Sequence, residues 1–367
     1  MPNKNDSFIP ALTGIRAVAA YFVFIHHYNF FTAARFGNRV HLFFSELHIG
    51  VTLFFVLSGL LLCLRYYDQA MNRSRNFYNY MVNRFARIYP VLFLVMTINF
   101  IAYQSKDAFA HQAIPNGWLY YLGSLSFLRG FFAGFYDFFV AQSWSLTVEE
   151  SFYVLCPFIL WLCRRSKYNV IYLPLGFIGM GMMIVHFAAN SLPYGFFTDY
   201  RFLFNFTFFG RCIEFFTGIA LAIWYKKNKP AVKKGTRFTS LGILGIIACV
   251  WGLSLLHTGN VYGDYFPGGI VINNLVLPVA GIAVLYRGLL SEKNGVTRIL
   301  ASPAFVLLGR ASYIFYLVHV GIFTEWFFQY FSKNPVLLFV YLNLLSILIY
   351  KFYEHPINNW LKQVLRK

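Results

Sequence analysis

Charge is what this sequence has least of, and acidic charge is especially scarce. Only 12% of the 367 residues are charged, and 13 are acidic against 31 Lys and Arg. A soluble domain carries about twice that charged fraction, so the composition excludes an ordinary soluble protein. The basic excess could indicate a nucleic-acid partner, but the basic residues are scattered in short clusters between apolar runs. Membrane topology explains that scatter better, and we expect no nucleic-acid partner.

Several chemical signatures are also missing. All five cysteines lie in apolar segments without CxxC spacing (Cys63, Cys156, Cys163, Cys212 and Cys249). That pattern indicates neither a disulfide framework nor a zinc site. The chain has no P-loop and no HExxH motif, which removes the most common signatures of nucleotide hydrolases and zinc proteases. We therefore expect no metal cofactor.

What the sequence has in abundance is apolar runs of about 20 residues, the length at which a helix crosses a bilayer. Hydrophobic residues make up 58% of the chain and aromatic residues 21%. The runs predict an all-α, polytopic membrane bundle with ten transmembrane helices, at 9–31, 49–64, 88–104, 144–163, 169–187, 203–225, 238–256, 269–286, 303–331 and 335–353. No soluble segment is left over, so 1–367 is predicted to form a single membrane-embedded domain.

The Lys and Arg residues predict the orientation of these helices. With a cytoplasmic N-terminus, 22 of them fall on the cytoplasmic side and six fall outside (Arg35, Arg39, Lys106, Arg129, Arg201 and Lys333). Because cytoplasmic segments carry the basic excess, both termini are predicted to be cytoplasmic. The segment 117–140 is aromatic but contains Arg129 and Asp137. If it crossed the membrane, the orientation of every later helix would be reversed. We interpret it as a re-entrant or interfacial segment on the outer side.

Arg16 and His27 lie eleven residues apart inside the first apolar run. At about 100° per residue, this spacing returns to the same face of a helix, so the two side chains share one stripe. Such side chains are costly in hydrocarbon and normally face a protein-lined cavity. The neighbouring His26 points about 100° away and is interpreted as a packing or interfacial residue.

A pair of arginines, Arg84 and Arg87, precedes the run at 88–104. Residues three apart are neighbours on a helix, so the pair could grip phosphate groups bidentately. For an isolated pair, anchoring of a helix on the cytoplasmic side is the simpler interpretation.

The remaining polar groups of interest lie in the later runs. Glu149, at the outer end of the fourth run, could orient a histidine or bind hydroxyl groups, and Trp144 beside it could be an interfacial anchor. Ser312, Tyr316 and His319 share a helix face, which could line a cavity or hold a hydrogen-bonded core histidine. Arg211 and Glu214 lie three residues apart in the sixth run and are predicted to pair with each other.

Taken in order, these fragments resemble the membrane acyltransferase-3 family of bacterial and animal acyltransferases. The resemblance runs from end to end and rests on six motifs: Leu12–Arg16 with His27, Gly50–Gly59, Arg84 and Arg87 before Tyr89-Pro90, Trp144–Glu150 with Phe152-Tyr153, Gly309–Tyr313 leading to His319, and Tyr353–Pro356. Each motif alone is weak, whereas six in order make a strong match.

The resemblance implies transfer of an acyl group, usually acetyl, from cytoplasmic acyl-CoA to a hydroxyl of a cell-surface or exported glycan. Arg84 and Arg87 would bind the CoA phosphates, and Arg16 would orient CoA or the catalytic histidine. His27 would be the general base that deprotonates the acceptor hydroxyl, with Glu149 as a further catalytic group. The acceptor would contact Trp144, Ser312, Tyr316 and His319.

The same resemblance sets the remaining expectations. Acetyl-CoA or another acyl-CoA would be the co-substrate, with no metal. The partners would be the lipid bilayer and a glycan or lipid-linked acceptor, and could include glycan-assembly proteins. The location would be the bacterial inner (plasma) membrane, crossed many times. The alternative is a transporter or flippase of a lipid-linked glycan or small solute, because intramembrane Arg, His and Glu also serve coupled transport.

Overall fold

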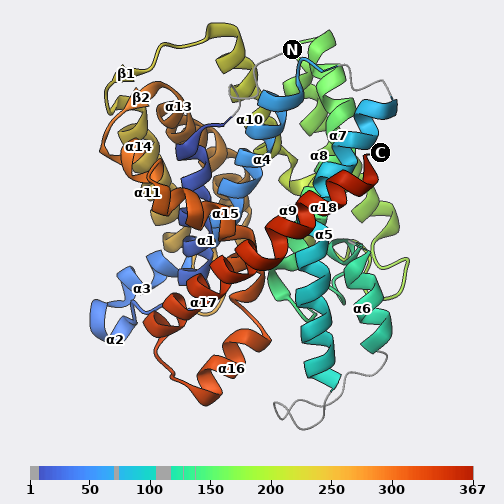
Figure 1. Cartoon of the computed structure of the whole chain (residues 1–367), viewed down its shortest axis with the longest axis vertical. Coiled ribbons are helices and arrows are strands. Elements are labelled where there is room, and N and C mark those ends of the chain that lie inside the picture. The colour runs from blue at the N-terminus through green and yellow to red at the C-terminus, as the bar shows by residue number, and fades with distance from the viewer. Residues whose placement is uncertain (1–7, 70–73, 105–116, 127, 137, 367) are drawn as a thin grey trace. The chain divides into compact units, whose positions relative to one another are not determined.

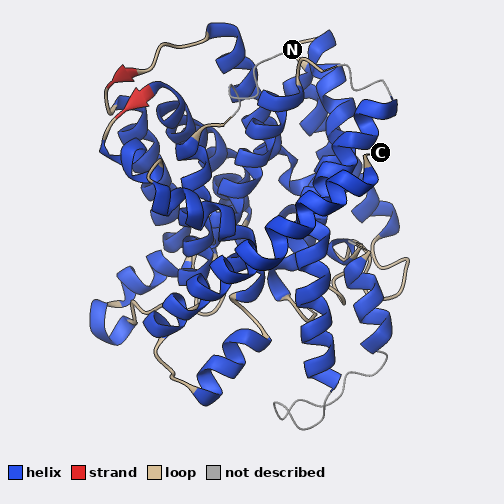
Figure 2. Ribbon diagram, viewed as in Figure 1, coloured by secondary structure: helices blue, strands red, loops and turns tan. Residues whose placement is uncertain are grey.

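The computed structural model describes residues 8–69, 74–104, 117–126, 128–136 and 138–366. Lys106 and Asp137 lie outside this range, as do three of the basic residues counted on the cytoplasmic side, Lys4, Arg73 and Lys367. Nearly all regular structure in the described part is helical, and the two-residue strands β1 (Lys233–Lys234) and β2 (Glu292–Lys293) form one parallel pair (Figure 2). The predicted all-α class is confirmed.

Figure 1 labels most of the α-helices and colours the chain from the N-terminus to the C-terminus. The first half contains α1 (Pro10–His27), α2 (Ala33–Phe36), α3 (Asn38–Ser45), η1 (Leu47–Ile49), α4 (Gly50–Tyr66), α5 (Ser74–Gln104), α6 (Gly117–Leu125), η2 (Arg129–Phe131), η3 (Ala141–Ser143), α7 (Trp144–Arg165) and α8 (Asn169–Ala188). The second half contains α9 (Tyr200–Phe206), α10 (Phe208–Asn228), α11 (Arg237–Leu256), η4 (Gly263–Tyr265), α12 (Pro267–Val271), the π-helical η5 (Ile272–Ile282), α13 (Ala283–Ser291), α14 (Gly295–Leu300), α15 (Pro303–Val318), α16 (Ile322–Tyr330), α17 (Pro335–Ile349), the π-helical η6 (Tyr350–Glu354) and α18 (His355–Leu365).

The chain forms two compact units, each interleaved in sequence, and each is described by itself. Unit 1 holds Met1–Gln69, Phe158–Met180 and Phe209–Arg310, whereas unit 2 holds Ala70–Pro157, Gly181–Phe208 and Ala311–Lys367.

Among the described residues, eight helical stretches are long and apolar enough to cross a membrane: Asn38–Tyr66, Arg75–Gln104, Ala141–Arg165, Asn169–Ala188, Tyr200–Asn228, Arg237–Leu256, Pro267–Ser291 and Pro335–Leu365. A ninth span results if α15 and α16 are counted together. The 18-residue helix α1 is not among them. A membrane protein built from helices is thus shown, while ten spans and cytoplasmic termini stay predictions.

Two predicted runs differ from the helices. The run 303–331 was expected to be one helix, but α15 and α16 meet at an angle of 83°. The break falls at Gly321, whose φ of 101° lies in a region that favours glycine. The run 88–104 is the second half of a longer helix, because α5 already begins at Ser74. Within 117–140, α6 has nine residues, too few to cross a bilayer.

Two glycines explain how α4 packs within unit 1. A Cβ atom at Gly50 would collide with the backbone carbonyl of Ala19 in α1, and one at Gly59 would collide with that of Phe215 in α10. Both positions therefore require a residue without a side chain so that the helix backbones can approach closely. The motif Gly50–Gly59 thus has a packing role in this structure.

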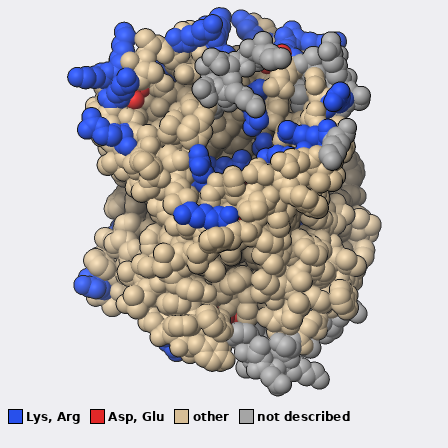
Figure 3. Space-filling model, in the orientation of Figure 1, with Lys and Arg blue, Asp and Glu red and all other residues tan. Residues whose placement is uncertain are grey.

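The surface is that of a membrane protein. Many large apolar side chains are exposed, such as Phe187 at 76% and Phe352 at 77%, and exposed apolar surface on this scale marks contact with lipid or protein. On the face drawn in Figure 3, Lys and Arg lie mostly in groups, and wide areas between them carry neither sign of charge.

Candidate functional site

The predicted base His27 is the last residue of α1 and is exposed, while Arg16 lies about three turns earlier in the same helix, in unit 1. The guanidinium of Arg16 lies 6.0 Å from the centre of the Phe54 ring in α4, a cation–π distance. The position of His27 leaves its imidazole accessible to a reactant. The adjacent His26 is held instead: its Nδ1 donates to the backbone carbonyl of Ser45.

Histidine rings and carboxylates gather next to this helix end. The ring centre of His26 lies 4.8 Å from those of His27 and Tyr262, and 5.4 Å from that of His48. His48 belongs to η1, which follows α3 directly.

Glu46, between α3 and η1, is the fully buried carboxylate of this group, with 0% of its surface exposed. Its Oε1 accepts from His257 Nδ1 at 2.6 Å and from the backbone N–H of Gly263 at 2.9 Å. Two donors from the segment after α11 thus fix the Glu46 carboxylate in one orientation.

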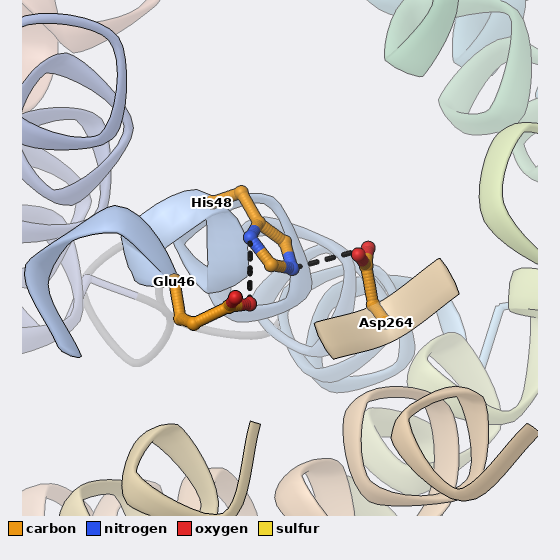
Figure 4. A group of neighbouring side chains, drawn as sticks. All are labelled: Glu46, His48 and Asp264. Atoms are coloured by element: carbon orange, nitrogen blue, oxygen red, sulfur yellow. Dashed lines mark ion pairs between the residues drawn. The ribbon is translucent and has the colours of Figure 1, made fainter. Parts of the chain in front are cut away.

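His48 lies between two carboxylates, with one ring nitrogen toward each (Figure 4). Its Nε2 is 3.1 Å from Asp264 Oδ2 and its Nδ1 is 3.6 Å from Glu46 Oε2. Burial alone would raise the pKa of the Asp264 carboxyl, but the opposite charge of His48 outweighs it and the pKa lies below its usual range. One ligand atom from each of the three residues lies within 4.8 Å of the others, so the Glu46–His48–Asp264 cluster could hold a cation.

A buried polar network continues deeper in unit 1. Arg211 and Glu214 pair at 2.8 Å, which confirms the prediction from their spacing. Arg211 Nη2 also donates to Thr52 Oγ1 at 3.0 Å, and Thr52 donates to Asn273 Oδ1 at 3.1 Å. Asn273 lies in the π-helical η5. These contacts tie α4, α10 and η5 together.

In unit 2, the predicted arginines and the predicted carboxylate come together around one tyrosine. Arg84 is 8% exposed, and its guanidinium lies 5.5 Å from the centre of the Tyr153 ring. The Tyr153 hydroxyl donates to Glu149 Oε1, one turn earlier in α7. It also lies within electrostatic reach of Arg87.

This grouping corrects the sequence interpretation. From the sequence, Arg84 and Arg87 were expected where the chain enters the membrane from the cytoplasm, ahead of the run at 88–104, and Glu149 at the outer end of the fourth run. Both arginines instead lie in the interior of the 31-residue α5, and Tyr153 connects Arg84 to Glu149. Apolar runs could not reveal this, because polar residues fill the first turns of α5.

The predicted acceptor contacts of α15 lie in a hydrogen-bonded core of unit 2. Ser312 is 1% exposed, Tyr316 6% and His319 0%. The Tyr316 hydroxyl donates to the backbone carbonyl of Gln142 at 2.9 Å and lies 2.7 Å from Ser145 Oγ. His319 Nδ1 donates to the Tyr316 carbonyl at 2.7 Å. Contacts of this kind suit a core histidine, so substrate contact by these residues stays a prediction.

Trp144 opens α7, is half-buried, and meets the Phe206 ring edge-to-face at 5.0 Å. The site residues therefore form two groups, Arg16 with His27 in unit 1 and the others in unit 2. Sequence reasoning assigned no role to Tyr153, Gln142 or the cluster of Glu46, His48 and Asp264. The only sequence signal for that cluster is the close spacing of Glu46 and His48, since Asp264 follows more than 200 residues later.

Comparison with known proteins gives the family. The O-acetyltransferase OatA of Staphylococcus aureus, in strains NCTC 8325 and COL, is 27% identical over 382 residues, which is 96% of this chain. A further relative from strain COL, named only provisionally as an O-acetyltransferase, is 25% identical over 384 residues. The chain spans 58% of the length of these relatives. No solved structure matches significantly.

The family described as an acyltransferase domain matches residues 9–351, nearly the whole chain. The resemblance noted from the motifs is confirmed: the chain belongs to the acyltransferase-3 family.

Proposed function

We propose that this chain is a membrane O-acetyltransferase that moves an acetyl group from cytoplasmic acetyl-CoA to a hydroxyl of a cell-surface or exported glycan, in the plasma membrane of a bacterium. The family and the names of the relatives support acyl transfer to oxygen. The observation that carries the proposal is the grouping of Arg84 and Glu149 about Tyr153, with Arg87 in electrostatic reach.

These arginines can bind an anion. Two guanidiniums on one helix can grip phosphate oxygens bidentately, and the low local dielectric of a buried position strengthens that attraction. The Tyr153 ring lies against the Arg84 guanidinium, so this part of the site would be organised before the CoA phosphates arrive. Organisation of this kind lowers the entropic cost of binding.

His27 then supplies the proton chemistry. A neutral imidazole at an exposed helix end can take the proton of an acceptor hydroxyl as the oxygen attacks the thioester carbonyl. The new bond joins that oxygen to the acetyl carbon, the carbon–sulfur bond breaks, and CoA leaves as the thiol after it receives the proton. Arg16, earlier on the same helix, would orient the CoA or the imidazole.

Acetyl-CoA binding by the purified chain in nanodiscs tests the donor assignment. Arg84→Gln and Arg87→Gln should each weaken binding about tenfold or more, because each removes a charge-assisted contact of about 1.5–3 kcal/mol. Arg75→Gln, an exposed arginine on the same helix, is the matched control and should bind normally. Failure of the wild-type chain to bind acetyl-CoA would refute the proposal and favour the transporter alternative.

A further inference from the structure

The Glu46–His48–Asp264 cluster has the composition of a metal site, and no part of the proposed acyl transfer uses it. It combines one imidazole with two carboxylates, and one ligand atom of each lies within 4.8 Å of the others. Imidazole and carboxylate are the ligands that Zn²⁺ and Mn²⁺ take in proteins. We propose that Glu46, His48 and Asp264 bind one divalent transition-metal cation.

An unsatisfied oxygen supports this assignment. Glu46 is fully buried, and while its Oε1 is saturated by His257 and Gly263, its Oε2 has no hydrogen-bond partner. Oε2 is directed at the His48 ring, at 3.6 Å from Nδ1. A buried carboxylate oxygen without a donor is costly, and a coordinated cation would remove that cost.

Charge points the same way. Glu46 and Asp264 place two carboxylates in a buried position, each beside one histidine: His257 lies 2.6 Å from Glu46 and His48 lies 3.1 Å from Asp264. Buried carboxylates need a positively charged partner. A divalent cation would neutralise both carboxylates, with His48 bound through one nitrogen in its neutral form. Ligand distances of about 2.0–2.2 Å require the three side chains to move together by roughly an ångström from their present separation.

Local structure already supports the ligands. Glu46 and His48 are separated by one residue at the start of η1, and Asp264 lies in the short η4. His257 and the Gly263 N–H hold the Glu46 carboxylate from behind, the kind of outer contact that orients metal ligands. A bound cation would join the turn after α3 to the segment between α11 and α12, beside the end of α1.

The alternative is a protonated His48 that forms ion pairs with both carboxylates and needs no metal. The amount of metal bound per chain, measured by mass spectrometry, distinguishes a metal site from these metal-free ion pairs. The chain is purified without a polyhistidine tag, stripped with a chelator, equilibrated with Zn²⁺ or Mn²⁺ in separate samples, and exchanged into metal-free buffer.

For the wild type we expect about one equivalent of one of these ions. Glu46→Gln and Asp264→Asn should lower the affinity at least tenfold, whereas Asp68→Asn, at an exposed ion pair with Lys226, should leave it unchanged. A wild-type chain that retains no ion above background would overturn the proposal, as would full retention by Glu46→Gln.

Thermal unfolding gives a second measurement that does not depend on catalysis. Because a ligand that binds only the folded state stabilises it, the matching ion should raise the unfolding midpoint of the wild type and leave that of Glu46→Gln unchanged. An equal rise in both proteins would contradict the site. Neither measurement depends on acyl transfer. A failure of the metal-site proposal can therefore be told apart from a failure of the proposed function.

Discussion

The guanidinium of Arg84 lies 5.5 Å from the centre of the Tyr153 ring, and both side chains are buried. The same tyrosine donates its hydroxyl to Glu149. One aromatic ring thus connects a candidate CoA-binding arginine to a candidate catalytic carboxylate within unit 2.

Tyr153→Phe tests whether that connection matters. The change keeps the ring beneath Arg84 but removes the hydrogen bond to Glu149, worth about 1.5–3 kcal/mol when one partner is charged. We expect transfer to fall about tenfold or more while acetyl-CoA binding stays near normal. Measured kcat and acetyl-CoA affinity check this, with Tyr168→Phe, an exposed tyrosine, as the control. Unchanged kcat would show that the hydroxyl has no part in turnover.

Gly59→Ala should destabilise the protein by about 1–3 kcal/mol, because the new Cβ would overlap the Phe215 carbonyl and push α4 from α10. Gly179→Ala in α8 is the matched control, since nothing lies within 4 Å of that position. There the better helix propensity of alanine should leave stability equal or slightly higher. Thermal unfolding in detergent compares the two, and equal midpoints would contradict the packing assigned to Gly59.

Glu292 should make stability depend on pH. Burial alone would raise the pKa of its carboxyl, but hydrogen bonds from Thr239 and the Phe238 N–H outweigh it and lower that pKa. A carboxyl whose pKa is lowered on folding stabilises the folded protein at pH values above its unfolded-state pKa, which is about 4.3 for Glu. That stabilisation is lost as the pH falls through the lower, folded-state pKa.

Glu292→Gln removes the charge and should reduce the unfolding midpoint at pH 7 more than at pH 4. Unfolding curves at both pH values check this, with Asp68→Asn as an exposed control expected to change little. A loss of equal size at both pH values would contradict the linkage.

The sequence predicted the helical membrane fold because apolar runs of spanning length can be read directly, and the family motifs identified the residues to examine. The start of α5 could not be predicted from the sequence, since its first turns are polar. Hydropathy identifies only the part of a helix that lies within the hydrocarbon. The bend at Gly321 was missed because the composition stays apolar on both sides of it. The Glu46–His48–Asp264 cluster was also missed, because a contact between residues so far apart depends on how α3 and α11 pack.

The most direct test of the account is acetyl transfer by the purified chain in nanodiscs, given acetyl-CoA and a crude surface-glycan extract. Wild type is compared with His27→Ala and with His186→Ala, an exposed histidine on α8. We predict that His27→Ala loses acetyl transfer but still binds acetyl-CoA, while His186→Ala transfers normally. Undiminished turnover by His27→Ala would contradict the account and place the base elsewhere.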